Sequence, residues 1–214
     1  MFSKKKKITH EKFKLLKDYL DSRRYEDKIV FKNGIYTGGV KKGNPAYYGS
    51  FIENNTGDQY IGQISFGVGH GFGRFIYAKG DYYEGELNKT KLLGYGFYIF
   101  KSGDRCSGYF QDAERHGYSL YSDGTGNTFE GETEKNIHVG YGIQCFSGGS
   151  RYEGNFSYNE FHGYGTYYYA DGATYVGSWW LGKRHGYGVF TYADGEVISG
   201  EFIDDDLPET NTND

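Results

Sequence analysis

The chain of 214 residues has few of the residues that punctuate or fill an ordinary globular fold. It contains 2 Pro, 1 Met and 2 Cys, and Leu is scarce. So little proline excludes a collagen-like chain despite the 35 Gly. Two thiols, Cys106 and Cys145, are too few for the disulfide framework of a small secreted domain, which favours a reducing compartment.

Long apolar stretches are also missing. No run approaches the roughly 20 apolar residues that a membrane-spanning helix needs. The N-terminus lacks the apolar segment of a secretory signal. We therefore expect a cytoplasmic chain that is neither secreted nor transmembrane.

Charge is divided unevenly along the chain. Residues 1–24 contain nine Lys or Arg and three Asp or Glu, which gives +6, and the net charge of the whole chain is -4, so the remainder carries -10 (-4 minus 6). Such an acidic body argues against nucleic acid as a ligand, because phosphate contacts need a basic face. The acidic, polar residues 204–214 are expected to form a disordered tail.

Aromatic residues and glycine are what the chain has in abundance. Tyr 24 and Phe 16 bring the aromatic content to 20%, although the mean hydropathy is only -0.73. A core built without much Leu must come from rings, and glycines offer flat backbone for rings to lie on. Many short strands joined by tight turns are the structure that this composition favours.

A period of 23 residues accounts for most of the glycine. Four columns of glycine repeat with this step, and Ser119 replaces one member of the fourth. They run from Gly57 to Gly195, from Gly62 to Gly200, from Gly71 to Gly186 and from Gly73 to Gly188. A fixed period of this length is typical of a repeat architecture in which each unit is one supersecondary element.

Each repeat contains the pattern of two short strands. Tyr152-Glu-Gly154-Asn-Phe156 alternates apolar residues with a bare glycine between them, as a strand with period 2 does. A second strand follows, with an aromatic residue between the third and fourth glycines. One turn has Gly or Asn at four of the six positions equivalent to Asn159, where positive φ is expected, and the other has Asp-Gly in the last full repeats, at Asp171-Gly172 and Asp194-Gly195.

These patterns predict an all-β fold. We expect an elongated single-layer antiparallel sheet of stacked β-hairpins over residues 31–203, with about seven or eight repeats of which the first is degenerate. Residues 1–30 form a separate basic segment. Within it, residues 9–24 have apolar side chains at helical spacing and predict one short amphipathic α-helix that caps the array.

The repeat resembles a known family. Tyr175-Val-Gly-Ser-Trp-Trp-Leu-Gly-Lys-Arg-His-Gly-Tyr-Gly188 matches the MORN pattern Y-x-G-x-W-x-x-G-x-x-H-G-x-G at every defined position, and Tyr152 to Gly165 departs only at Phe156 and Asn159. The likeness covers about residues 34–203. It implies a β array used for protein contact or dimerisation, often in cytoskeletal or ciliary assemblies, and some members of the family have been assigned phosphoinositide binding. The fold does not choose among these functions.

Residues that could carry chemistry follow the period instead of forming a site. His70, His116, His162 and His185 share one column, and equivalent atoms of successive hairpins lie roughly 9.5 Å apart, too far for two ligands of one zinc ion. A hydrogen bond that stabilises a turn is the expected role. Recurring glutamates would share similar solvated surroundings, unlike the two carboxylates of a glycosidase. We therefore expect no catalytic residue, metal site, cofactor or small-molecule substrate.

A non-enzymatic scaffold for protein–protein interaction is the function that these observations favour. The partner-binding candidates are the tyrosines of the aromatic column, because a Tyr ring is apolar while its hydroxyl can stay hydrated. They are Tyr95, Tyr118, Tyr141, Tyr164 and Tyr187. The partner would be another protein, a second copy of the chain or a larger cytoskeletal or ciliary (axonemal) complex.

Two alternatives remain open. One is a peripheral membrane protein that binds phosphoinositide or another anionic lipid through Lys4, Lys5, Lys6 and Lys7, since each Lys near an anionic membrane contributes about 1 kcal/mol. The other is a regulatory subunit of a separate enzyme.

Small-angle X-ray scattering tests the repeat interpretation. A stacked array should have a radius of gyration well above the ~17 Å that compact-domain scaling gives for this chain length. A value near that of a compact domain, together with a helix-rich circular dichroism spectrum, would contradict the predicted array.

Overall fold

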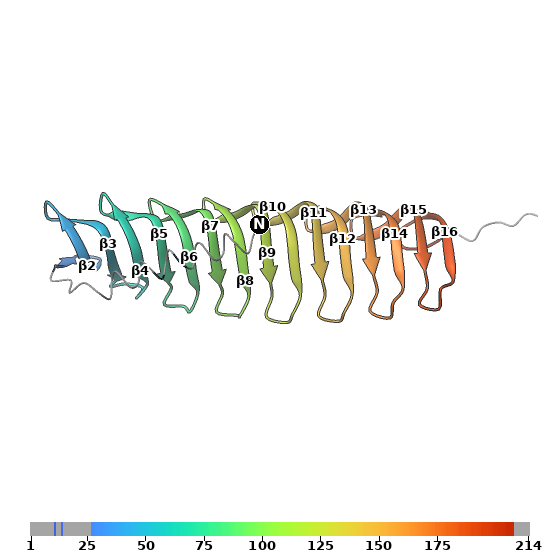
Figure 1. The fold of residues 1–214 in the computed structure, drawn as a ribbon, viewed down its shortest axis with the longest axis horizontal. Coiled ribbons are helices and arrows are strands. Elements are labelled where there is room, and N and C mark those ends of the chain that lie inside the picture. Colours follow the sequence, from blue (N-terminus) through green and yellow to red (C-terminus); the bar gives the residue numbers. More distant parts are fainter. Residues whose placement is uncertain (1–10, 12–13, 15–26, 208–214) are drawn as a thin grey trace, which may run out of the picture. The chain divides into compact units, whose positions relative to one another are not determined.

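The computed structural model describes residues 11, 14 and 27–207 (Figure 1). Between Asp27 and Leu207 it contains sixteen β-strands and no helix, which confirms the predicted all-β class. The helix expected over residues 9–24 lies outside the described residues, except for Glu11 and Lys14. The four lysines Lys4–Lys7 also lie outside them. The chain divides into two compact units, Met1–Glu114 and Arg115–Asp214.

In unit 1 the strand order follows the chain, and each strand pairs antiparallel with the next. The strands are β1 (Lys28–Phe31), β2 (Gly34–Lys41), β3 (Asn44–Glu53), β4 (Gln59–Ser65), β5 (Val68–Ile76), β6 (Tyr82–Asn88), β7 (Lys91–Ile99) and β8 (Arg105–Gln111).

Unit 2 repeats the same arrangement of antiparallel neighbours, beginning within β9. Its strands are β9 (Glu114–Ser122), β10 (Thr128–Glu134), β11 (Ile137–Cys145), β12 (Arg151–Ser157), β13 (Glu160–Tyr168), β14 (Thr174–Trp180), β15 (Lys183–Thr191) and β16 (Val197–Phe202). The predicted succession of hairpins is thus confirmed in both units.

Two kinds of turn alternate along the chain. Between β12 and β13, Tyr158 and Asn159 both have positive φ, 51° and 69°, as a two-residue type I′ turn requires. The positive φ of Asn159 was predicted, and that of the bulky Tyr158 was not. Between β13 and β14, Gly172 has a φ of 97° and closes a three-residue loop in which the Tyr169 N–H donates to the Ala173 carbonyl at 2.9 Å. The Asp-Gly signal therefore marks a loop one residue longer than the two-residue turn.

A tyrosine lying over two facing glycines is the packing unit of the array. Gly154 of β12 faces Gly165 of β13, and the ring of Tyr152, 0% exposed, covers both. A Cβ added at Gly165 would lie 2.4 Å from the Tyr152 hydroxyl oxygen. That hydroxyl donates to the Asn155 carbonyl at 2.9 Å. The glycines are required because any side chain there would occupy the space of the ring.

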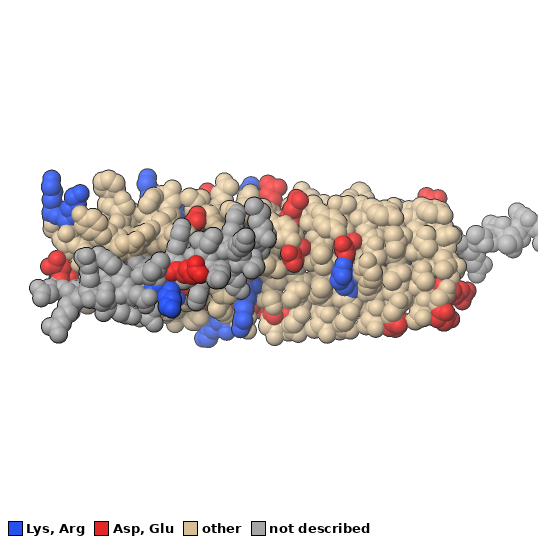
Figure 2. Space-filling view, in the orientation of Figure 1, with Lys and Arg blue, Asp and Glu red and all other residues tan. Residues whose placement is uncertain are grey.

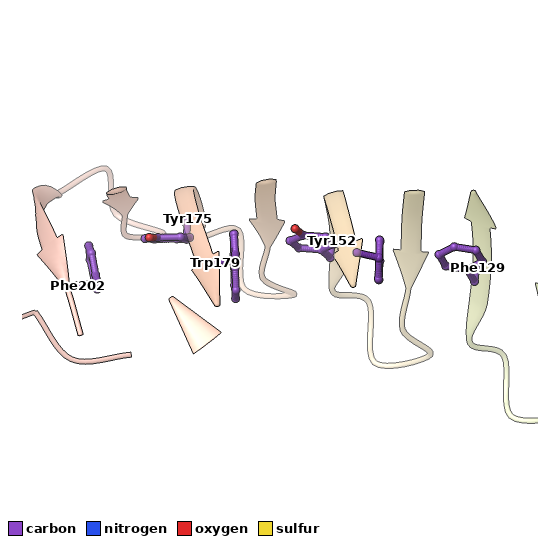
Figure 3. Close-up of a cluster of buried hydrophobic side chains, with 6 residues drawn as sticks. Phe129, Tyr152, Tyr175, Trp179 and Phe202 are labelled. Atoms are coloured by element: carbon purple, nitrogen blue, oxygen red, sulfur yellow. The ribbon is translucent and has the colours of Figure 1, made fainter. Parts of the chain in front are cut away.

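Rings of successive hairpins then pack edge to face. In unit 2, Tyr152 meets Trp179 at 5.3 Å between centroids and 85° between planes, and Tyr175 meets Phe202 at 5.1 Å and 81° (Figure 3). Such geometry suits the ring quadrupoles and adds roughly 0.5–1.5 kcal/mol per pair beyond burial. The aromatic core thus runs from hairpin to hairpin along one face of the sheet, called here the inner face.

A third glycine column has a backbone role instead. Gly163 has a φ of 64°, and a Cβ there would meet only the Asn155 side chain, at 3.5 Å. Space is therefore available, but the left-handed backbone disfavours any L side chain, β-branched ones most of all.

We expect Gly163→Val to lower the free energy of unfolding by roughly 1–3 kcal/mol, because valine is strained at this φ. Glu153→Ala, on the adjacent strand, should change it by less than ~1 kcal/mol, since Glu153 is partly solvated. Urea denaturation followed by tryptophan fluorescence measures both. Equal losses for the two variants would contradict a left-handed requirement at Gly163.

In the hairpins β10–β11 and β12–β13, the residue nine positions after the core ring covers that ring from the inner face. In unit 2, Phe161 stacks on Tyr152 at 3.8 Å, and His138 stacks on Phe129 at 3.5 Å with the rings 2° from parallel. Burial, with a smaller contribution from Arg115, lowers the pKa of His138 from 6.5 to about 4. The folded state therefore favours the neutral form of the His138 imidazole.

The lowered pKa of His138 makes the stability of the folded chain depend on pH. The imidazole of His138 binds a proton with a pKa near 6.5 in the unfolded chain and only near 4 in the folded chain. The contribution of His138 to the free energy of unfolding is therefore fully present above about pH 6.5 and is lost as the pH falls towards 4. We expect a loss on the order of 1 kcal/mol, measured by thermal melts across this range. His138→Phe, which copies Phe161, should reduce the slope. An unchanged slope would show that His138 doesn't sense pH.

Candidate functional site

The two faces of the sheet have different roles in unit 2. Along β13, Phe161, Gly165 and Tyr167 point to the inner face, while Tyr164 and Tyr168 lie on the opposite side. Alternation along each strand assigns every residue to one face. We call this opposite side the outer face, and it carries the column of aromatic residues that was predicted to bind a partner.

The structure separates the five predicted tyrosines by exposure. In unit 1, Tyr95 is buried at 6% and packs edge-on against Tyr109 at 5.8 Å. The four in unit 2 become steadily more open along the chain: Tyr118 36%, Tyr141 50%, Tyr164 61% and Tyr187 65% exposed. Tyr95 therefore isn't available on an open surface, and the row that a partner could reach lies in unit 2.

The rings of this row don't pack on one another. Tyr141 lies opposite Asn155, Tyr164 opposite Ser178 and Tyr187 opposite Glu201, so a strand with a non-aromatic side chain separates each tyrosine from the next. Successive tyrosines of the row are thus two strand spacings, or roughly 9.5 Å, apart. Mutual burial, which would have made the column purely structural, therefore doesn't occur here.

Hydrogen bonding divides the row into two halves. The Tyr118 hydroxyl donates to Glu130 and the Tyr141 hydroxyl to Glu153, both at 2.6 Å. Burial and the Glu130 hydrogen bond raise the pKa of Tyr118 to about 12. These acids restrain the two rings against the sheet.

At the next two repeats the acceptors disappear. Val176 and Ser199 occupy the positions that Glu130 and Glu153 hold earlier. The hydroxyls of Tyr164 and Tyr187 have no hydrogen-bond partner among the residues that the structure describes. Both rings are therefore open and unrestrained.

A largely aromatic patch results over β13–β16, with Glu201 opposite Tyr187 and Lys183 opposite Trp180. We define the outer aromatic face by its six apolar members, with Trp180 52% and Val197 57% exposed beside the two open tyrosines. The members are Tyr164, Tyr168, Val176, Trp180, Tyr187 and Val197. Figure 2 shows a broad area over these strands without Lys, Arg, Asp or Glu. Acidic side chains, including Glu130, Glu132 and Glu153, lie on β10 and β12 beside it.

Trp180 wasn't among the predicted binding residues. Its neighbour Trp179 is buried at 5% in the inner core, so strand alternation places Trp180 on the outer face, where it packs against His162 at 4.6 Å. The Trp-Trp pair in a strand with period 2 was the signal that could have identified it.

The histidine column does not behave as expected. His185 contacts Asp204 at 3.3 Å, but the buried Nδ1 atoms of His116 and His162 have no hydrogen-bond partner. The Nδ1 atoms of these two residues therefore do not form the predicted turn-stabilising bond, and the His162 ring packs against Trp180 instead. No group of His, Cys, Asp and Glu in residues 27–207 could hold a metal ion.

Comparison with known proteins identifies the repeat. The chain matches the MORN repeat family at residues 60–82, 83–105, 152–174 and 175–197. No curated protein sequence matches it. No helix within the described part of the chain is long and apolar enough to cross a membrane.

Two solved structures are among those to which this chain is similar. One is the TCP domain of SAS-4 (dCPAP) from Drosophila melanogaster, in complex with a proline-rich motif of Ana2 (dSTIL). It is 15% identical, with a TM-score of 0.46, and the match covers 81% of this chain and 88% of that chain. The other is the TCP10 domain of Danio rerio CPAP, 14% identical with a TM-score of 0.26, covering 82% and 94%. At these values neither bears on function.

Proposed function

Since the chain is a MORN repeat protein, we propose that it is a non-enzymatic scaffold whose outer aromatic face binds a segment of a protein partner. One observation carries this proposal: Tyr164, Trp180 and Tyr187 are each more than half exposed on one face of neighbouring strands. Large rings left open in this way are typical of interface hot spots.

The chemistry of the face defines the segment that fits it. Two free tyrosine hydroxyls can each exchange a hydrogen bond with a partner backbone, while the rings and Val176 accept apolar side chains. Glu132 lies on β10, Glu153 on β12 and Glu201 on β16. A short apolar segment flanked by Lys or Arg is therefore complementary in both shape and charge.

A membrane is a poorer match for this face. Acidic side chains border it, and they would be repelled by an anionic lipid surface. The lysines Lys4–Lys7, on which lipid binding would depend, lie outside the described residues. The setting that we expect from the family resemblance is a cytoskeletal or ciliary assembly, with the partner supplied by that assembly.

The double variant Tyr164→Ser/Tyr187→Ser tests the proposal. Both side chains are exposed, so the fold should keep its melting temperature, while loss of two hot-spot rings should weaken partner binding by about tenfold or more. The partner would be identified by photo-crosslinking from position 180 and then titrated in purified form. Tyr118→Ser is the matched control, because its ring is restrained by Glu130 and lies outside the patch.

Vesicles that contain phosphoinositide provide the rival outcome. Replacing Lys4–Lys7 by Gln should leave partner binding unchanged if the scaffold proposal is correct. Flotation with vesicles that survives the tyrosine changes, vanishes with the lysine changes and falls steeply with salt would reject it in favour of a peripheral membrane protein.

A further inference from the structure

A cavity of about 480 Å³ opens on the inner face of unit 1. Its walls combine rings with carboxylates: Tyr36, Phe51, Tyr60, Phe75, Glu53 and Asp58 line it. Phe31 and Val68, 38% and 39% exposed, lie at its rim. The cavity is therefore open to solvent, aromatic and acidic at once.

Two departures from the repeat create this space. Gly69 occupies the position that covers the core ring in the other hairpins, where the side chains are Leu92, Arg115, His138, Phe161 and Arg184. Glu53, four residues after the facing glycine of its strand, stands at a position where all but one of the later repeats carry a ring, the exception being Asp123. The rings are Tyr77, Phe100, Phe146, Tyr169 and Tyr192. One missing side chain and one missing ring leave the core ring of this hairpin, Tyr60, beside a cavity.

Arg184 shows how the protein fills the same position elsewhere. Its guanidinium carbon lies 5.8 Å from the Tyr175 ring centroid and 5.5 Å from that of Phe190. Its Nη2 donates to the Asp205 carbonyl at 2.7 Å. Arg115 repeats part of this arrangement, 5.0 Å from the Tyr121 ring and with its Nη2 donating to the Asn136 carbonyl at 3.1 Å, although Cys106 replaces the core ring in its hairpin.

Two of the three rings around Arg184 have a counterpart around Gly69, whereas Phe202, 5.3 Å from Arg184, corresponds to Leu87. Tyr60 and Phe75 stand at the offsets of Tyr175 and Phe190, and Thr90 stands at that of Asp205. The Thr90 N–H donates to the Gly69 carbonyl at 2.8 Å, as the Asp205 N–H does to the Arg184 carbonyl at 2.9 Å. Tyr60, Phe75 and Thr90 all line the cavity. The position is thus built like an arginine site but lacks the arginine.

The two carboxylates make the cavity selective for a cation. Asp58 accepts from the Ala78 N–H at 2.8 Å and Glu53 from the Thr56 hydroxyl at 3.0 Å. Neither forms an ion pair with a residue that the structure describes. An apolar guest would desolvate these charges without compensation, whereas a guanidinium could stack on the rings and hydrogen-bond to the carboxylates.

We infer that the cavity at Gly69 binds the guanidinium group of an arginine side chain supplied by a partner polypeptide. The planar cation takes the place that Arg184 occupies in its own hairpin, with Glu53 and Asp58 as counter-charges. The site is in unit 1 and on the inner face. Its failure would therefore leave the outer aromatic face of unit 2, and the proposed function, unaffected.

Titration of the full chain with capped Gly-Arg-Gly tests this site. We expect saturable binding at millimolar peptide, seen as NMR shifts of the Tyr60 and Phe75 ring protons. The citrulline peptide, which has nearly the same shape without charge, should bind about tenfold more weakly or not at all, and the lysine peptide less well than arginine because it can't stack as a plane. Equal binding of the arginine and citrulline peptides, or no shift at millimolar peptide, would overturn the inference.

Two variants locate the binding. Gly69→Leu, which copies Leu92, should abolish it and keep the melting temperature, since the φ of Gly69 isn't in the left-handed region and only Tyr60 and Thr90 need shift slightly. Glu53→Gln should weaken binding several-fold, while the matched control Glu86→Gln, on the outer face of β6, should not. Arginine binding that persists in Gly69→Leu would place the site elsewhere.

Discussion

Contact between a tyrosine ring and two glycines on paired strands is the constraint on which this structure depends. Each ring needs both glycines bare, because a Cβ at Gly154 or Gly165 would enter the volume that Tyr152 fills. A single sheet has no second layer to bury its core. By lying flat on the backbone, the ring completes a core inside one hairpin and presents its edge to the next. The 23-residue period is the spacing at which this unit recurs.

The turns and the left-handed glycines serve the same purpose. A type I′ turn such as Tyr158-Asn159 gives the two strands the twist that brings the glycines face to face. The backbone N–H of its second residue then bonds to the preceding hairpin, as Asn159 does to the His138 carbonyl at 3.2 Å. Hairpins are therefore joined by backbone hydrogen bonds at the turns and by ring edges between them, and each depends mainly on its neighbours.

Both proposed binding sites lie where the repeat is broken. Replacement of the acid position by Val176 and Ser199 leaves the hydroxyls of Tyr164 and Tyr187 open on the outer face. Replacement of a covering side chain by Gly69, and of a ring by Glu53, leaves a cavity on the inner face. A regular repeat satisfies its own groups, so an irregular one leaves surface or space that a partner can use.

The sequence by itself determined the period, the all-β class, the positions of the strands and the positive φ of turn residues that are Gly or Asn, such as Asn159, because these depend on local spacing and on residue type. It did not predict the positive φ of Thr90 and Ala113. It also placed the aromatic column on one face, since alternation along a strand is a local rule. Tertiary structure decided which members of that column are accessible. Tyr95 is buried and Tyr164 is open although both fill the same place in the repeat. The Tyr118–Glu130 hydrogen bond and the contact between Trp180 and His162 depend on side chains of adjacent strands, 12 and 18 residues apart in the sequence, and the period averages over such differences.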